Sequence, residues 1–261
     1  MRFTHRPVLA VLALYFAGLF FWQPAFADVA LRIGGSTNVT PALKKMAPDY
    51  QAAHPGTTIT IEGSSSGQGL AALKAREIDV AASDVAVNDP DLLDTKIGVV
   101  GFVFVVGHGA GVTNVTRDDV AGIYSGKITN WKQIGGNDLA IVPFSRPIGA
   151  GTRFVFEMNV AKTLIPMTIE PDATAVVNAV ASTPGGIGYS STNYLGTHED
   201  LVVRYEGVPP TESNILDHRY AFSTDEHVYT LKPASPEAMS FVAYIARQHA
   251  VLKSFGILSD E

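Results

Sequence analysis

Short apolar runs alternate with amphipathic segments along most of the chain. The first such pair is a run at residues 29–33, followed by a segment from about Pro41 in which apolar residues recur at helical spacing. The same alternation predicts further strands at 57–62, 78–82, 99–106, 139–144, 187–190, 202–205 and 227–231. It predicts further helices at 67–76, 116–125, 152–164, 173–181 and 236–249. Repeated strand–helix units predict an α/β fold of mainly parallel sheets flanked by helices.

Three glycine- and hydroxyl-rich turns each join a predicted strand to a predicted helix. They read Gly-Gly-Ser-Thr-Asn at 34–38, Ser-Ser-Ser-Gly-Gln-Gly at 64–69 and Arg-Pro-Ile-Gly-Ala-Gly-Thr at 146–152. A glycine turn at a helix start leaves backbone N–H groups free at the positive end of the helix dipole, where anions bind. Open α/β sheets also bind their ligands at these strand ends. Three such turns, one of them with an arginine, indicate a tetrahedral oxyanion held from several sides.

The first 27 residues have the pattern of a secretory signal peptide. A basic start with Arg2 and Arg6 precedes an apolar run at 8–22, and residues 25–27 form an A-x-A cleavage signal. We expect cleavage before Asp28. An uncleaved membrane anchor is the alternative, which is disfavoured because the run is short for a bilayer span.

The composition argues against several kinds of site. The chain has no cysteine, which removes disulfides, thiolate metal sites and a cysteine nucleophile. Acidic residues outnumber basic ones, 25 against 19, and the formal net charge is −6, which argues against nucleic-acid binding. The histidines after residue 27 show no metal-ligand spacing, so we expect neither a metal nor a cofactor.

Six motifs follow one another in the order GSTNVTPA, GSSSGQG, AASD, IYSGKITNW, RPIGAGTRFVFE and TPGGIGY. In this order they strongly resemble the periplasmic phosphate-binding proteins of phosphate-specific ABC transporters, and the resemblance spans almost all of the chain after residue 27. It implies a two-lobed periplasmic-binding-protein fold with phosphate between the lobes. The implied lobes are 28–107 with 220–261, and 108–219. The implied crossover strands lie near 102–106 and 221–229.

The resemblance also implies a set of phosphate-binding residues. They are Thr37, Asn38, Ser66, Asp84, Arg146, Ala150, Gly151 and Thr152. Hydroxyl groups and helix N-terminal amides would donate to phosphate oxygens, and Arg146 would add a charge-assisted fork. Asp84 would accept the proton of HPO4²⁻ and repel fully ionised sulfate, since a carboxylate can only accept. No catalytic residue is implied.

The turn at 146–152 departs from the usual family pattern. Ala150 stands where the family usually has serine, so one hydroxyl donor is absent, and Ile148 stands where some members carry an acid. Losing a hydrogen bond to a charged ligand costs roughly 1.5–3 kcal/mol if nothing replaces it. Ser145, Arg153 or water are candidate replacements, and a related oxyanion is the alternative ligand.

Each candidate residue also has a structural interpretation. Thr37 and Ser66 could serve as helix N-caps, and Asp84 could start a turn. Lys127, Trp131 and Tyr189 are interpreted as structural.

Three function classes follow from these residues. The first is a periplasmic, monomeric binding protein that delivers phosphate to a membrane ABC permease. The second is a binding or sensing protein of the same fold for another oxyanion, without a transport partner. The third is a secreted hydrolase, disfavoured because no histidine lies near the candidate serines in the sequence and no metal cluster is indicated.

Overall fold

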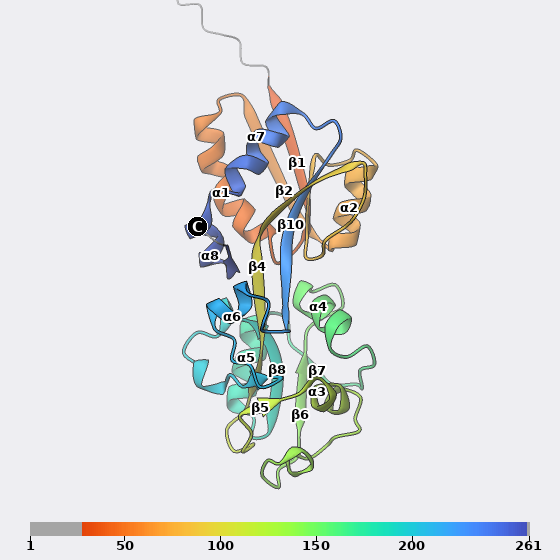
Figure 1. The fold of residues 1–261 in the computed structure, drawn as a ribbon, viewed down its shortest axis with the longest axis vertical. Helices are drawn as coiled ribbons and strands as arrows, with labels where there is room; N and C mark the ends of the chain where they lie inside the picture. Colours follow the sequence, from red (N-terminus) through yellow and green to blue (C-terminus); the bar gives the residue numbers. More distant parts are fainter. Residues whose placement is uncertain (1–27, 260–261) are drawn as a thin grey trace, which may run out of the picture.

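Two lobes lie one above the other in the computed structural model, which describes residues 28–259 (Figure 1). The predicted signal peptide lies outside the described residues. Within residues 28–259, no helix has the length and apolar character that a membrane span needs.

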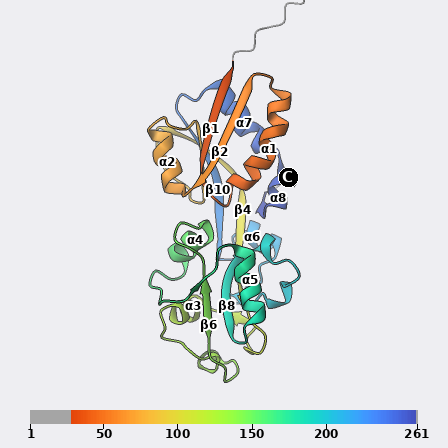
Figure 2. The ribbon, with the colours of Figure 1, turned by 180° about the vertical axis from the view of Figure 1, so that it is seen from behind.

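The upper lobe of Figure 1 contains three parallel strands in the order β2-β1-β3. The strands are β1 (Val29–Ser36), β2 (Thr57–Ser64) and β3 (Val80–Ser83). The helices are α1 (Thr40–Ala53), α2 (Ser66–Lys74), α7 (Pro236–Ile245) and α8 (His249–Ser254). Helix α2 packs on β1 and β3, whereas α1 packs against β2, α7 and α8. Figure 2 shows α1 and α2 on opposite sides of the lobe.

The lower lobe repeats this plan with parallel strands in the order β8-β6-β7. Its strands are β6 (Val142–Ser145), β7 (Thr168–Ile169) and β8 (Gly186–Ser191), and the pair β5 (Asn114–Val115) and β9 (Arg204–Tyr205) forms a separate small sheet. Its helices are α3 (Arg117–Tyr124), α4 (Gly151–Asn159), α5 (Ala173–Ser182) and α6 (Glu212–Leu216), with 3-10 turns at Trp131–Ile134, Thr192–Tyr194 and Glu199–Leu201.

Two long strands connect the lobes. Strand β4 (Leu92–Val106) pairs antiparallel with β10 (Ser223–Leu231) in its first part and with β8 in its second part. Strand β10 also pairs with β3, and the short β11 (Ile257–Leu258) pairs with β4. Figures 1 and 2 show β4 and β10 running side by side between the lobes. The predicted two-lobed α/β fold is confirmed, and the antiparallel neighbours of its parallel strands are these connecting strands.

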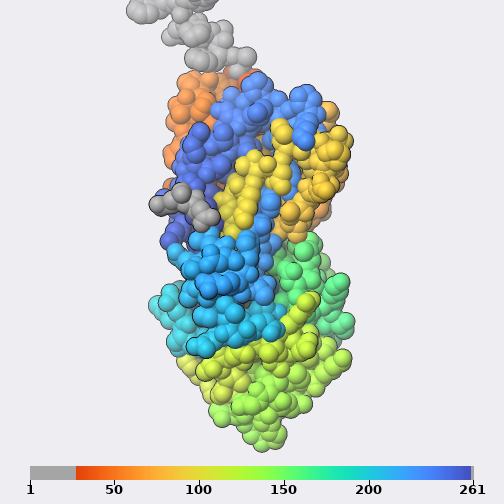
Figure 3. Space-filling view, in the orientation of Figure 1, coloured from red at the N-terminus to blue at the C-terminus, as the bar shows by residue number. Residues whose placement is uncertain are grey.

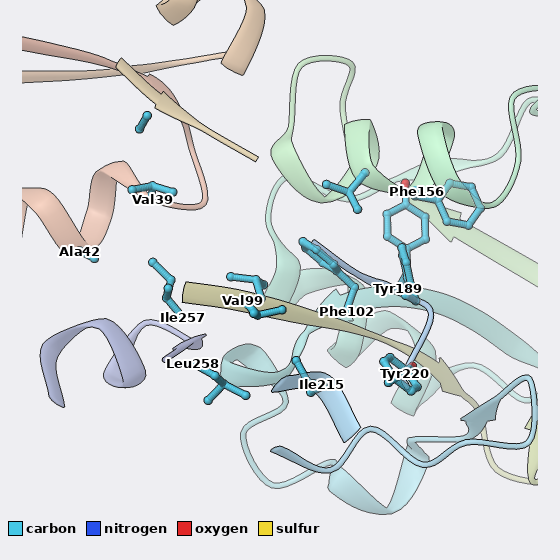
Figure 4. Packing of buried hydrophobic residues seen from close by; sticks show 14 of the residues in the cluster. Val39, Ala42, Val99, Phe102, Phe156, Tyr189, Ile215, Tyr220, Ile257 and Leu258 are labelled. Atoms are coloured by element: carbon cyan, nitrogen blue, oxygen red, sulfur yellow. The ribbon is translucent and has the colours of Figure 1, made fainter. Parts of the chain in front are cut away.

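An aromatic cluster lies where β4 and β10 enter the lower lobe (Figure 4). Phe104 stacks on Phe222 with ring centroids 4.8 Å apart, and Phe156 stacks on Tyr189 at 4.2 Å. All four rings are fully buried. The hydroxyl of Tyr189 bonds to Ser145 Oγ at 2.7 Å, which ties the end of β6 to this core. The predicted structural role of Tyr189 is therefore confirmed.

Several predicted element bounds are wrong. Strand β1 continues to Ser36 rather than ending at Ile33, because Gly34 and Gly35 keep pairing with β2. Helix α4 ends at Asn159 instead of Leu164, and Pro166 disfavours helical geometry just before it. The predicted helix 236–249 is two helices, α7 and α8. Its apolar spacing continues across the break, so periodicity alone does not reveal the break.

Candidate functional site

The three glycine-rich turns meet where the two lobes face each other. The backbone N–H of Gly151 donates to Thr37 Oγ1 across the cleft at 3.2 Å. The Asn38 side chain also lies against Gly151, since a Cβ on this glycine would come within 2.8 Å of it. In Figure 3 the gold surface of the upper lobe and the green surface of the lower lobe touch. The cleft is therefore closed around these turns.

Two small cavities remain between the turns, with volumes of about 150 Å³ and 140 Å³. Both are lined by Thr37 and Gly151. The predicted site residues that line one or both cavities are Thr37, Asn38, Ser66, Asp84, Arg146, Gly151 and Thr152. Ala150 directly precedes Gly151 at the start of α4. Larger hollows occur elsewhere on the described surface, and the predicted residues do not line them.

Asp84 is the centre of a hydrogen-bond network in the upper lobe, where it is 1% exposed. Its Oδ1 accepts from the Ser36 hydroxyl and from Asn38 Nδ2, the latter at 3.0 Å. Its Oδ2 accepts from Ser66 Oγ at 2.8 Å. The backbone N–H of Asp84 in turn donates to Ser66 Oγ at 3.0 Å. Because an ionised carboxylate only accepts, this set of donors suits a buried negative charge.

The N-cap interpretation of Ser66 and Thr37 is wrong. Ser65 is the N-cap of α2, with a capping box to Gln68. The residue at the N-cap of α1 is Val39, which makes no side-chain cap. The hydroxyls of Ser66 and Thr37 instead face Asp84 and the opposite lobe.

Ser36 is a site residue that the sequence reasoning missed. It is 1% exposed, its hydroxyl donates to Asp84, and the Asn38 N–H donates to that hydroxyl at 3.0 Å. The only signal for it in the sequence is its place beside Thr37 in the first glycine turn. Two adjacent hydroxyl residues there leave open which one faces the carboxylate.

Glycines bring the upper half of the site together. A Cβ on Gly35 would lie 2.1 Å from the carbonyl oxygen of Ala82, and one on Gly69 would lie 2.5 Å from the Cα of Gly35. No side chain fits at these distances, so β1, β3 and α2 approach closely only with glycine at both positions. This close approach places Ser66 and Asp84 within hydrogen-bond distance.

Arg146 follows β6 and is half-buried at the lower wall of the cleft. Its Nη2 donates to the Pro171 carbonyl at 3.4 Å, while its Nε is buried without a partner. Within residues 28–259 no carboxylate lies at ion-pair distance from it. Partial burial lowers the pKa of Arg146 below that of a free arginine, and the nearby charge of Asp172 opposes this shift. Thr152 Oγ1 is likewise buried without a partner. These donors face the second cavity.

The candidate replacements for the missing serine hydroxyl are already engaged. Ser145 bonds to Tyr189, and Arg153 pairs with Glu157 at 2.7 Å while donating to the Arg146 carbonyl at 2.9 Å. Ala150 is the N-cap of α4 and makes no side-chain cap. Ile148 is 88% exposed and lines the rim of the same cavity as Asp84 and Ser66.

Comparison with known proteins agrees with this geometry. Residues 23–248 match the model of the PBP superfamily domain. The phosphate-binding protein PstS of Bacillus subtilis is 30% identical over 227 residues, which cover 84% of this chain and 76% of that protein. An ABC-type phosphate transport receptor from Vibrio cholerae superposes with a TM-score of 0.81 at 26% identity, over 88% of this chain and 100% of that one. A putative phosphate ABC transporter substrate-binding protein with bound phosphate, from Clostridium perfringens, gives 0.72 at 26% identity, over 89% and 100%. The chain therefore belongs to the PBP superfamily and, more narrowly, to its PstS family.

Proposed function

We propose that this protein captures inorganic phosphate between its lobes and delivers it to a membrane ABC permease. The observation that carries the proposal is the pairing of a buried acceptor, Asp84, with buried and unpartnered donors on Arg146 and Thr152 around one closed cleft. Such a site offers charge-assisted donors to an oxyanion and one acceptor for a ligand proton. The relatives from Bacillus subtilis and Clostridium perfringens are phosphate-binding proteins by name, which supports the same ligand.

The binding residues that we assign are the predicted set, and Ser36 supports them by holding Asp84 in place. The Thr37 hydroxyl would donate from the upper lobe, and the Gly151 N–H and Thr152 hydroxyl from the lower lobe. Ser66 and Asn38 line the cavities and hold the acceptor Asp84 in place. At Ala150 only the backbone is available. The phosphate would displace the hydrogen bond between Gly151 and Thr37, which frees both groups for the ligand.

We propose that the lobes, residues 28–107 with 220–261 and residues 108–219, open and close about β4 and β10. Two connecting strands side by side form a hinge of the kind that periplasmic binding proteins use. The bond between Gly151 and Thr37 across the cleft supports this proposal, because it exists only when the lobes are together.

We also propose that the protein is a monomer and that it has no catalytic activity. Its export to the periplasm would use the predicted signal peptide, which is then cleaved. The strongest feature for an enzyme is Ser65, which stands in a Gly-x-Ser-x-Gly pattern at 63–67. Its hydroxyl, however, is engaged in capping α2. Among the described residues, no histidine bonds to it. A turnover assay with a chromogenic phosphate ester should therefore show no activity.

Equilibrium binding of radiolabelled phosphate tests the proposed function. Arsenate should compete, whereas a large excess of sulfate should not, because sulfate lacks the proton that Asp84 accepts. Asp84→Asn should relax this exclusion, since an amide can also donate. The matched control is Asp91→Asn, in the exposed turn that follows Asp84. Sulfate binding by wild type as tight as phosphate binding would favour the other-oxyanion alternative.

A further inference from the structure

Glu226 is a buried acid with no role in the site as described so far. It lies on β10 and is 0% exposed, and within the described residues no N–H or O–H group donates to either of its carboxyl oxygens. Transferring an ionised carboxylate into such surroundings without a partner is so costly that the group usually becomes neutral instead. We therefore ask whether the carboxyl group of Glu226 carries a proton in the folded protein, and what that proton bonds to.

The neighbour of Glu226 is Asp84. In the antiparallel register between β10 and β3, His227 pairs with Ser83, so the next position of the ladder brings Glu226 beside Asp84. Two ionised carboxylates are both acceptors and cannot bond to each other, whereas one proton between them supplies a donor. Burial, together with the charge of Asp84 and a hydrogen bond to it, raises the pKa of Glu226 well above its usual range.

The donors around the pair show which carboxyl holds the proton. Asp84 already accepts from Ser36, Asn38 and Ser66, all of which stabilise its charged form. No such donor reaches Glu226 within the described residues. The proton therefore belongs on Glu226.

The other charged groups near Glu226 are paired among themselves. Asp225, the preceding residue, adds a like charge that favours the neutral acid, and Lys96 lies 2.7 Å from its carboxylate. The remaining groups are His218, 3.4 Å from Asp225, and His227, whose Nδ1 lies 2.7 Å from Asp94. Among the described residues, no cation pairs with Glu226.

We propose that Glu226 is a positioning residue of the anion site: its protonated carboxyl donates to Asp84, so that the pair carries one negative charge and the acceptor stays fixed. As far as it concerns phosphate, this inference rests on the proposed function. Glu226→Gln keeps a donor at all pH values, whereas Glu226→Leu removes the donor at similar volume.

The first test measures thermal unfolding against pH without phosphate. Between the pKa of an unfolded glutamate and the raised pKa of Glu226, the folded protein holds a proton that the unfolded chain lacks. The stability of wild type should therefore fall as the pH rises above the ordinary range of a glutamate pKa. Relative to wild type, Glu226→Gln should lose this slope, and the exposed Glu62→Gln should keep it. Equal slopes for wild type and Glu226→Gln would overturn the inference.

The second test measures phosphate affinity near neutral pH. Glu226→Gln should stay within about threefold of wild type, whereas Glu226→Leu should bind about ten- to a hundredfold more weakly, the effect of losing one hydrogen bond to a charged group. Weakening of both variants to the same extent would contradict the positioning role. If wild type itself binds no phosphate, the proposed function fails, and the unfolding slopes still decide where the proton lies.

Discussion

The two halves of the site differ in how their hydrogen bonds are satisfied. In the upper half, the Asp84 carboxylate accepts three side-chain hydrogen bonds from its own lobe. In the lower half, Arg146 Nε and Thr152 Oγ1 are buried without partners. The acceptor of the upper half is held by its own lobe, whereas the lower half presents donors that have no protein partner within the described residues.

This difference suggests that one half of the site sets the choice of anion and the other half sets the strength of binding. A carboxylate held by fixed donors is a rigid acceptor, which suits it to distinguish a protonated from an unprotonated oxyanion. A buried donor without a partner carries a desolvation cost that a bound anion offsets, so its contribution appears as binding energy. We expect the upper half to determine which anion binds and the lower half to determine how tightly.

Removing the arginine should give the largest change. Arg146→Ala should weaken phosphate binding by about thirtyfold or more, since losing the charge partner of an anion costs roughly 2–5 kcal/mol. Its stability without ligand should change little, because Arg146 is half-buried and its hydrogen bond to the Pro171 carbonyl is long, at 3.4 Å. Titration calorimetry and thermal unfolding measure the two effects, with the exposed Arg204→Ala as control. A loss of stability together with unchanged phosphate affinity would contradict the role of the lower half in binding strength.

Blocking the contact between the halves should have a smaller effect. A Cβ at Gly151 would lie 2.8 Å from the Asn38 side chain, so Gly151→Ala should oppose closure at a cost of about 1–3 kcal/mol, a five- to hundredfold loss of affinity. Small-angle scattering at saturating phosphate should then show a larger radius of gyration than wild type.

Gly67→Ala is the matched control for this prediction. It is the same change in the first turn of α2, where a Cβ would meet nothing within 4 Å. If Gly151→Ala closes as fully as wild type, the contact with Asn38 does not control closure.

The sequence predicted the family, the two-lobed fold and the turns that meet in the cleft, because these follow from local motifs such as Ser66 and Arg146 with their glycines. It could not predict Glu226, which lies 142 positions from Asp84 in the chain (226 − 84) and meets it only through the register of β10 with β3. It also missed Ser36, since only the position of Asp84 decides between neighbouring hydroxyls. Contacts set by strand register carry no local signal.

The smallest effect is expected from a substitution at Ala150, where the lower half of the site departs from the usual family pattern. Ala150 is the N-cap of α4 and makes no side-chain cap, so Ala150→Ser should first supply that cap, with a gain in stability of about 1 kcal/mol. A hydroxyl that accepts from the helix can also donate its proton to a phosphate oxygen, which should tighten binding by up to about tenfold. Thermal unfolding and phosphate titration separate the two gains, and Ala150→Gly, which restores no hydroxyl, is the control. A gain in stability without a gain in affinity would mean that the backbone at 150–152 already satisfies the ligand there. The lower half would then need no hydroxyl at this position, and its binding energy would come from Arg146, Thr152 and the backbone N–H groups of the turn.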